Sequence, residues 1–283
     1  MQARLVEHHS GKHQVVSSLM YAALVVFAVL MIFPMLWMAV SAFKPMDEIF
    51  SHPVTLVPKS PTLENFKGLF EAMPFARNLL NSAYVAVVST AASLFFCALG
   101  GFGFAKYAFR FKGPLFLLLL GSMMIPQEVL MIPLYVEFQK LHWIDTHWGL
   151  IIPGMANAFG IFFMKQFIES LPEELMEAAR IDGLGEFGIF TRIVLPIIRP
   201  AFASLGIIFF MNSWNNFLWP LILLKSEGMY TLTVAIYSIT GGIREPFHII
   251  MAGSFVSVLP LMIIFLIFQR QFIAGITSGA VKG

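Results

Sequence analysis

Apolar residues dominate six long stretches of this chain, and shorter polar segments separate them. A helix needs about 20 consecutive, mainly apolar residues to cross a hydrocarbon core about 30 Å thick. Stretches of this kind occupy residues 19–43, 79–103, 115–135, 150–167, 201–224 and 249–268. The pattern therefore predicts an all-α, polytopic membrane protein with six transmembrane helices.

Composition supports a membrane protein. Of the 283 residues, 58% are hydrophobic and only 12% are charged, whereas soluble domains carry about 25% charged residues. The net charge of +2 indicates no basic surface for nucleic acid, and the single cysteine, Cys97, cannot form a disulfide within the chain. Residues 1–18 are expected to form a cytoplasmic segment and residues 19–283 a single transmembrane domain. The histidines of the first segment lie near a chain end, where order is uncommon, so we expect no metal site.

Positive charges predict the orientation. If both termini face the cytoplasm, eleven of the 18 lysines and arginines lie on inner segments and seven on outer loops. Cytoplasmic segments usually carry this excess. The contrast is sharper per residue, because the outer loop of residues 44–77 alone holds four of the seven. We therefore predict a multi-pass protein of the cell (inner) membrane with both termini cytoplasmic, and residues 170–200 lie on the cytoplasmic side.

Residues 170–200, here called the charged loop, contain five acids and three arginines. Ser170 followed by Glu173 fits a capping box, in which the hydroxyl and the carboxylate each accept a free amide at a helix start. A helix can then continue to about Ile181. Gly183 stands at the C′ position, where glycine adopts the left-handed conformation without a Cβ penalty. The sequence therefore predicts a short amphipathic helix followed by a glycine stop.

A second short helix is expected from about residue 186 to residue 194. It should end before Pro196, because proline disfavours helical geometry in the preceding residue. On the first helix, apolar or small residues gather on one face and charged residues on another; the first set is Leu171, Leu175 and Ala178 or Ala179, and the second is Glu173, Glu177 and Arg180. An ordinary amphipathic helix lying on the membrane would also fit this pattern.

The charged loop resembles the EAA loop of ATP-binding-cassette importer permeases. The likeness lies in Glu177-Ala178-Ala179, three residues, Gly183, nine residues, and then Ile193-Val194-Leu195-Pro196. In that family this loop forms a cytoplasmic coupling helix that docks on an ATPase subunit. The resemblance implies docking roles for Glu173, Glu177, Ala178, Ala179, Arg180, Asp182, Gly183, Ile193, Leu195 and Pro196.

Polar residues inside two of the apolar stretches need an explanation. The fifth stretch holds Trp214, Asn215, Asn216 and Trp219 near its outer end. Amides within a span need partners across a helix interface or along a wet path, so these four residues either join helices or form part of a translocation pathway or gate. An interfacial aromatic belt would explain Trp219. Glu128, in the third stretch, is either a functional residue within the span or lies near the end of the span in a proline-broken segment in contact with water, and we favour the second interpretation.

Nearly the whole chain is similar to permease subunits of carbohydrate-type importers, close to the maltose permease group. The segments that carry this similarity are Ser41–Pro45, Leu63–Phe66, Arg77-Asn78 with Asn81-Ser82, Phe104–Tyr107, Met124–Pro126, Trp214-Asn215 to Trp219-Pro220, and Gly279–Gly283. The resemblance implies a homologous second permease subunit, two copies of an ATPase subunit, an extracytoplasmic sugar-binding protein and membrane lipid as partners. It also suggests that the tail, residues 269–283, approaches the ATPase pair.

No phosphate-binding loop of the form Gly-x-x-x-x-Gly-Lys-Ser/Thr occurs in the chain. We therefore expect no catalytic residue and no cofactor here, with ATP and Mg²⁺ on a partner ATPase. Three other functions remain to be weighed: an importer permease for another solute such as glycerol phosphate, a stand-alone secondary transporter, and a membrane enzyme. The spans are nearly free of ionisable residues, which disfavours a secondary transporter.

Overall fold

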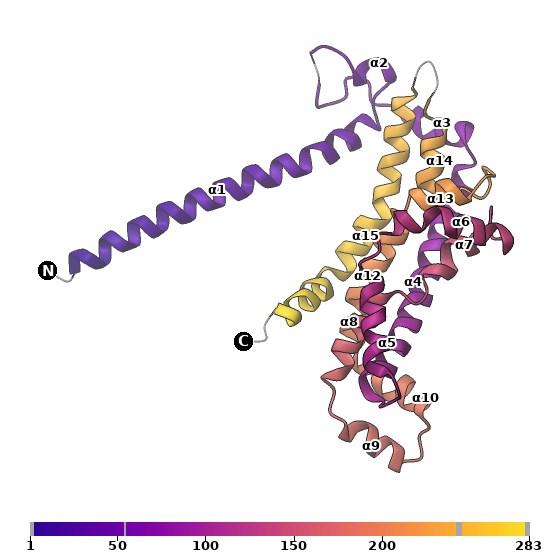
Figure 1. The fold of residues 1–283 in the computed structure, drawn as a ribbon. Coiled ribbons are helices and arrows are strands. Elements are labelled where there is room, and N and C mark those ends of the chain that lie inside the picture. Colours follow the sequence, from indigo (N-terminus) through magenta and orange to yellow (C-terminus); the bar gives the residue numbers. More distant parts are fainter. Residues whose placement is uncertain (1–2, 54, 242–244, 281–283) are drawn as a thin grey trace. The chain divides into compact units, whose positions relative to one another are not determined.

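The computed structural model describes the backbone of residues 3–53, 55–241 and 245–280, and the side chains of residues 16–53, 55–241 and 245–269. Among these residues every element of regular secondary structure is a helix, and loops connect the helices (Figure 1). The chain divides into two compact units. The first comprises residues 1–71 and 241–256, and the second comprises residues 72–240 and 257–283.

The first unit contains a long helix and a hydrogen-bonded loop. Its elements are α1 (Ala3–Ser41), α2 (Met46–Ile49), most of α3 (Glu64–Ala72) and the start of α15 (Phe247–Ala280). The apolar side chains of α1 are exposed from Val16 to Leu36, so this helix needs the apolar surroundings that a membrane supplies. The helix continues through Pro34.

Two buried polar side chains organise the loop after α1. Asn65 donates hydrogen bonds from Nδ2 to the carbonyl oxygens of Ala42 and Lys44, at 2.9 and 2.8 Å. Glu48 accepts the backbone N–H of Lys59 at 2.7 Å, and this bond is the main cause that lowers the pKa of its carboxyl group. The Ser41–Pro45 and Leu63–Phe66 segments therefore act together as a folded connection.

The second unit contains the remaining helices. In chain order they are α4 (Phe75–Lys106), α5 (Lys112–Ser122), η1 (Gln127–Leu130), α6 (Met131–Lys140), α7 (Trp148–Ile151), η2 (Ile152–Gly154), α8 (Ala158–Glu169), α9 (Glu174–Ile181), α10 (Glu186–Ile189), the π-helix η3 (Phe190–Val194), α11 (Leu195–Ile197), α12 (Arg199–Trp214), α13 (Leu218–Leu223), α14 (Leu232–Ser238) and the rest of α15.

Among the described residues, four helical segments are long and apolar enough to cross a membrane, and the number rises to six if each of two bent pairs forms one span. The bent pairs are residues 112–122 with 127–140, at 91°, and residues 186–197 with 199–214, at 81°. The third predicted span, 115–135, is broken between α5 and η1. Pro126 lacks an N–H group and disfavours helical geometry in the residue before it, so the helix breaks there.

The fifth predicted helix, 201–224, is also interrupted. The helix α12 ends at Trp214, and α13 begins only at Leu218. Asn215 closes α12, its backbone N–H donating to the carbonyl of Met211 at 3.0 Å. The polar side chains that marked this stretch in the sequence therefore lie at a helix break.

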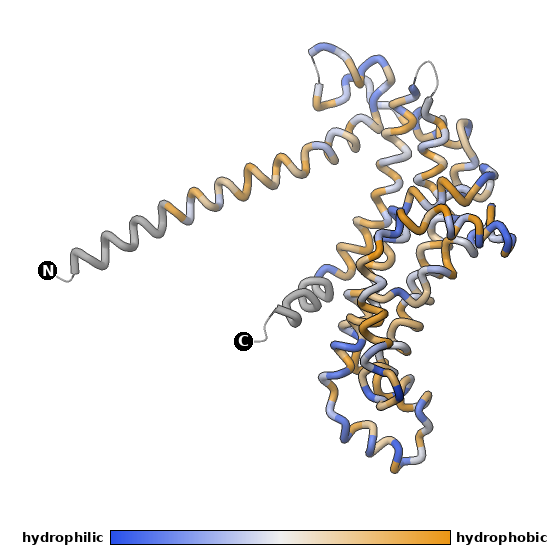
Figure 2. Tube along the Cα trace, viewed as in Figure 1, coloured by the Kyte–Doolittle hydropathy of each residue, from blue (hydrophilic) through white to orange (hydrophobic). Residues whose placement is uncertain are grey.

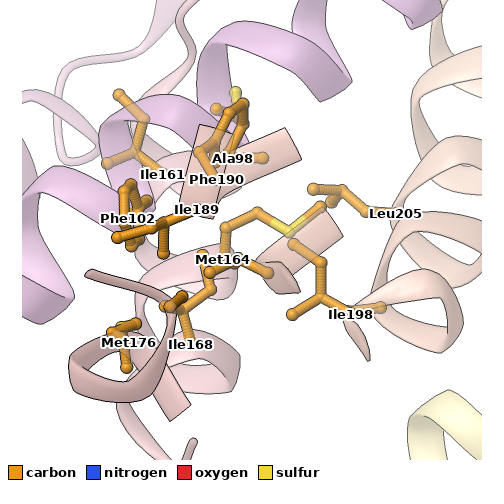
Figure 3. Packing of buried hydrophobic residues seen from close by; sticks show 14 of the residues in the cluster. Ala98, Phe102, Ile161, Met164, Ile168, Met176, Ile189, Phe190, Ile198 and Leu205 are labelled. Atoms are coloured by element: carbon orange, nitrogen blue, oxygen red, sulfur yellow. The ribbon is translucent and has the colours of Figure 1, made fainter. Parts of the chain in front are cut away.

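The core of the second unit forms where α4 packs against α8 and α12. A Cβ atom added to Gly101 would lie 2.8 Å from the backbone nitrogen of Lys165, so α4 and α8 approach closely because glycine stands there. Buried side chains of α8, α9, η3 and α12 complete one cluster around them, including Met164, Phe190 and Leu205 (Figure 3).

Alternate loops lie at opposite ends of this unit. At one end, Asn78 at the start of α4 donates from Nδ2 to the carbonyl of Glu227 at 2.8 Å. At the other end, Lys106 at the end of α4 donates from Nζ to the carbonyl of Leu171 at 2.5 Å. Hydrophilic positions concentrate at these ends, and apolar positions fill the length of α4, α8 and α12 between them (Figure 2). The loops therefore alternate as the predicted topology requires.

Candidate functional site

The charged loop forms the end of the second unit where α9 and α10 lie (Figure 1). Its first helix, α9, ends before Gly183, which has φ = +83°, as the predicted C′ glycine requires. The predicted capping box is wrong. Ser170 instead closes α8, and its hydroxyl donates to the carbonyl of Phe167 at 2.7 Å. The residue that precedes α9 is Glu173, whose side chain makes no capping bond.

The second helix of the charged loop does not end before Pro196. It continues from α10 through η3 and α11 to Ile197, and Leu195 has helical angles of φ −55° and ψ −44°. A proline ring inside an α-helix collides with the carbonyl four residues earlier. Here the preceding segment is the π-helix η3, in which each hydrogen bond spans one residue more than in an α-helix. The wider turn moves the carbonyl groups away from the ring of Pro196, so the proline fits.

The buried face of α9 differs from the predicted one. Met176 and Ala179 are buried in the cluster with α8 and η3. Leu175, which was predicted for the apolar face, is exposed, and so is Ala178, the predicted alternative to Ala179; Ile181 is 86% exposed. Because these three residues follow one another at three-residue intervals, they form an uncovered stripe along one side of the helix. We call Leu175, Ala178 and Ile181 the α9 stripe.

The other expected docking residues lie around this stripe. The side chains of Glu173, Glu177 and Asp182 are exposed, as are Gly183 and Pro196. Ile193 and Leu195 are half-buried and pack against the core cluster. Ile193 and Leu195 therefore attach the charged loop to the core, whereas the acids and the α9 stripe are exposed.

Arg180 binds within the chain. Its Nε atom donates to Glu186 Oε1 at 2.9 Å, and the hydroxyl of Tyr107 donates to Glu186 Oε2. These bonds, that of Arg180 first, lower the pKa of Glu186. Burial, together with the bond to the carboxylate, raises the pKa of Tyr107 to about 12. The end of α4, the end of α9 and the start of α10 thus meet at one carboxylate, which joins α4 to a segment distant in sequence.

A polar cavity of about 410 Å³ lies within the helical part of the second unit. Polar residues from four segments line it, among them Ser89, Ser93, Glu128, Asn157, Asn212 and Asn216. Asn157 has a structural task as well, because its Oδ1 atom accepts the N–H of Gly160 at 2.8 Å and caps α8. A second hollow of about 290 Å³ shares Gln127, Asn216 and Trp219 with the first.

The structure separates the four residues predicted for a pathway. Asn216 and Trp219 line the polar cavity. Trp214 is only 4% exposed, and its Nε1 atom donates to the carbonyl of Ser257 at 3.0 Å. Asn215 is exposed next to the helix break and does not line the cavity. A pathway along the cavity would therefore use Asn216 and Trp219, while Trp214 joins α12 to α15.

Sequence reasoning missed part of the cavity. Ser89 and Ser93 were not singled out, although two hydroxyl residues four apart in an apolar span mark one polar helix face. Glu128 is exposed and lines the cavity, and its contact with water stays a prediction. Among the described side chains, no group of three or more His, Cys, Asp and Glu residues could hold a metal ion. The histidines of residues 1–15 lie outside the described side chains.

Known proteins similar to this chain are transport permeases. Residues 96–278 match the family "Binding-protein-dependent transport system inner membrane component". The arabinooligosaccharides transport system permease protein AraQ of Halalkalibacterium halodurans is 39% identical over 259 residues, covering 90% of this chain and 93% of that protein. The lactose transport system permease protein LacG of Rhizobium radiobacter is 33% identical over 262 residues, covering 93% and 95%. The sn-glycerol-3-phosphate transport system permease protein UgpE of Yersinia pestis is 31% identical over 263 residues, covering 90% and 94%.

One solved structure extends the similarity to the fold. It is the crystal structure of a bacterial ABC transporter involved in the import of the acidic polysaccharide alginate. A chain of that transporter superposes with a TM-score of 0.84 over 92% of this chain and 97% of its own length, at 21% identity. The predicted all-α membrane fold and the resemblance to importer permeases are confirmed.

Proposed function

This chain belongs to the family of binding-protein-dependent transport system inner membrane components, and we propose that it is one of two permease subunits of an ATP-driven sugar importer. As a member of that family it is a multi-pass inner membrane protein and a transport component, not an enzyme. The observation that carries the proposal further is the α9 stripe. It is a row of uncovered apolar side chains on α9, next to exposed acids.

The α9 stripe needs a partner. Ile181 is 86% exposed, and an apolar side chain gains free energy when a protein surface covers it. In our proposal the partner is an ATPase subunit, which also binds the ATP and Mg²⁺ for which this chain has no phosphate loop. The charged loop then faces the cytoplasm, together with both termini. Two ATPase copies, a homologous second permease and an extracytoplasmic binding protein complete the importer.

A sugar suits the polar cavity. Amide and hydroxyl side chains such as Asn216 and Ser93 can pair with sugar hydroxyls, and Trp219 supplies an aromatic face for a sugar ring. The relatives described above include an arabinooligosaccharide permease and a lactose permease. A permease for sn-glycerol-3-phosphate is also among them, so this anion is the second candidate solute.

The test is co-purification followed by transport. The tagged chain is expressed with its neighbouring genes, extracted in mild detergent and reconstituted. We expect a second permease and an ATPase in the complex, and ATP hydrolysis that rises when binding protein and sugar are added. Arabinotriose, lactose and sn-glycerol-3-phosphate serve as probes. Stimulation by the glycerol phosphate alone would replace the sugar assignment. A chain that purifies alone and moves solute under an ion gradient without ATP would overturn the importer proposal.

A docking variant sharpens this test. Ile181→Asp places a charge on the α9 stripe and should release the ATPase from the complex while the chain still inserts in the membrane. Val57→Asp is the matched control, because Val57 is 78% exposed in the loop after α2. If Ile181→Asp retains the ATPase as firmly as Val57→Asp does, the α9 stripe is not the docking surface.

A further inference from the structure

Three of the helices around the polar cavity, α4, α8 and α12, are attached to the charged loop in different ways. The loop follows α8 directly and continues into α12 through α11. Both helices also contribute cavity residues, Asn157 at the start of α8 and Asn212 in α12. The third helix, α4, contributes Ser89 and Ser93 but has no chain connection to the charged loop. A displacement of α9 would therefore reach α4 only through contacts.

Two adjacent residues at the end of α4 make such contacts. Lys106 donates from Nζ to the carbonyl of Leu171, three residues before α9 begins, at 2.5 Å. The hydroxyl group of Tyr107 donates a hydrogen bond to Glu186, which lies five residues after α9 ends. The contacts thus lie on either side of α9. One contact would be a pivot about which α9 could turn, whereas two contacts resist rotation and transmit translation.

The second contact is tied to α9 itself. Glu186 also accepts the guanidinium of Arg180, the penultimate residue of α9, at 2.9 Å. Apolar contacts support the same junction: the ring of Phe102 on α4 stacks on Phe190 with centroids 5.6 Å apart. Apolar contacts are non-directional, but the hydrogen bonds to Lys106 and Tyr107 fix direction. Ser93 lies 13 residues before Lys106, a rise of about 20 Å along α4.

We propose that Lys106 and Tyr107 form a two-point linkage, here called the α4 linkage, that carries the displacement of α9 into α4 and so to the cavity. The inference rests on the proposed function, since it assumes that an ATPase moves α9. Lys106 and Tyr107 are positioning residues, and they act on the solute only through α4. The helices α4, α8 and α12 then all follow the charged loop, two by chain connection and one by the α4 linkage.

The variants Lys106→Met and Tyr107→Phe each remove one contact with little change of side-chain volume. Arg110→Met is the control, because Arg110 lies in the same loop and its guanidinium stacks on the neighbouring Phe111 ring. Lys106→Arg keeps a donor that can reach the Leu171 carbonyl and should restore function. In the reconstituted complex, the readout is solute moved per ATP hydrolysed, which a purely structural role would leave unchanged in complexes that assemble normally.

We expect the two single variants to lower this ratio, and the double variant to lower it by about two- to fivefold, the factor by which losing partly exposed hydrogen bonds shifts an equilibrium. Arg110→Met and Lys106→Arg should match the wild type. A double variant with the wild-type ratio, or an equal fall in Arg110→Met, would overturn the α4 linkage.

Hydrogen exchange separates failure of the α4 linkage from failure of the proposed function. In the full chain, the amides of Glu174–Ile181 should exchange about two- to fivefold faster in the double variant, with those of α12 unchanged. Unchanged exchange in α9 would overturn the α4 linkage whatever the partners are. A wild-type chain that purifies without an ATPase would overturn the proposed function, while the exchange result would still decide whether the linkage holds α9.

Discussion

A Cβ atom on Gly160 of α8 would lie 2.6 Å from the Sγ atom of Cys97 on α4. Cys97 is completely buried, and Phe209 of α12 closes the same site at 2.7 Å. No flexible surface side chain is available to move aside, so Gly160→Ala should cost about 1–3 kcal/mol of stability, as overpacking does in other cores. Thermal unfolding of the purified complex in lipid nanodiscs measures this loss.

The control for this variant is Gly103→Ala. Gly103 lies in the same span as Cys97, but nothing lies within 4 Å of a Cβ atom added there. Because alanine favours helix more than glycine does, Gly103→Ala should leave the unfolding temperature unchanged or raise it slightly. If both variants lower it equally, the close approach of α8 to α4 is not what makes Gly160 necessary.

Gly183 is required for its backbone and not for space. Its φ is +83°, and nothing lies within 4 Å of an added Cβ atom. Gly183→Ala should therefore cost about 1–2 kcal/mol through left-handed strain alone, and Gly183→Asn less, because asparagine tolerates this region. Hydrogen exchange of the α9 amides should rise in the order glycine, asparagine, alanine. Equal exchange for asparagine and alanine would mean that the side chain itself collides with a partner.

The lengths of the apolar stretches and the position of a glycine predicted the spans and the end of α9, because the causes of these features are local. Apolar run length reports the thickness of the membrane core directly, and Gly183 ended α9 because a left-handed residue is a property of a few neighbouring bonds. These features need no knowledge of distant parts of the chain.

Other features depend on distant contacts and were missed. Pro196 was expected to stop a helix, but the π-turn before it allows the helix to continue. Met176 took the buried position on α9 because α8 and η3 cover that side. The contact between Tyr107 and Glu186 joins residues 79 apart in sequence. No local pattern contains such information.

Asn78 holds the loop between α13 and α14 by hydrogen bonds that its amide nitrogen donates. Its side chain is fully buried, and Nδ2 bonds the carbonyls of Glu227 and Tyr230 at 2.8 and 3.1 Å. Asn78→Asp removes both donors and aims negative charge at two carbonyl oxygens, so it should destabilise by about 2–3 kcal/mol or more. Gln139→Glu, the same change at an exposed position, should be neutral. Thermal unfolding distinguishes them, and equal effects would contradict this role.

Asp145 provides a pH-dependent contact in the same region. Burial alone would raise its pKa, but hydrogen bonds from the hydroxyl and N–H of Ser226 and the N–H of Lys225 hold it below the usual value. A lowered folded-state pKa gives stability above the unfolded value of about 3.9 and loses it as the pH falls through the folded value.

The Asp145→Asn variant tests this sign. Asp145 has φ = +58°, which asparagine tolerates, so the substitution changes the charge without adding backbone strain. The wild type should unfold at a higher temperature than the variant from about pH 8 to about pH 5, and the difference should shrink below about pH 4. A difference that stays constant across this range would show that the ionised carboxylate contributes nothing.

The four residues around the helix break should separate into two classes when they are replaced. Asn216 and Trp219 line the polar cavity, so Asn216→Ala and Trp219→Ala should lower the transport rate while the complex unfolds at the wild-type temperature.

Trp214 is buried and bonded to the Ser257 carbonyl at 3.0 Å. Trp214→Phe should lower the unfolding temperature by losing a hydrogen bond worth about 1 kcal/mol, with transport per folded complex retained. Asn215→Ala, at an exposed position, is the control for both measurements. If Trp214→Phe reduces transport at full stability while Asn216→Ala does not, solute passes on the α15 side of α12 and the polar cavity is not the pathway.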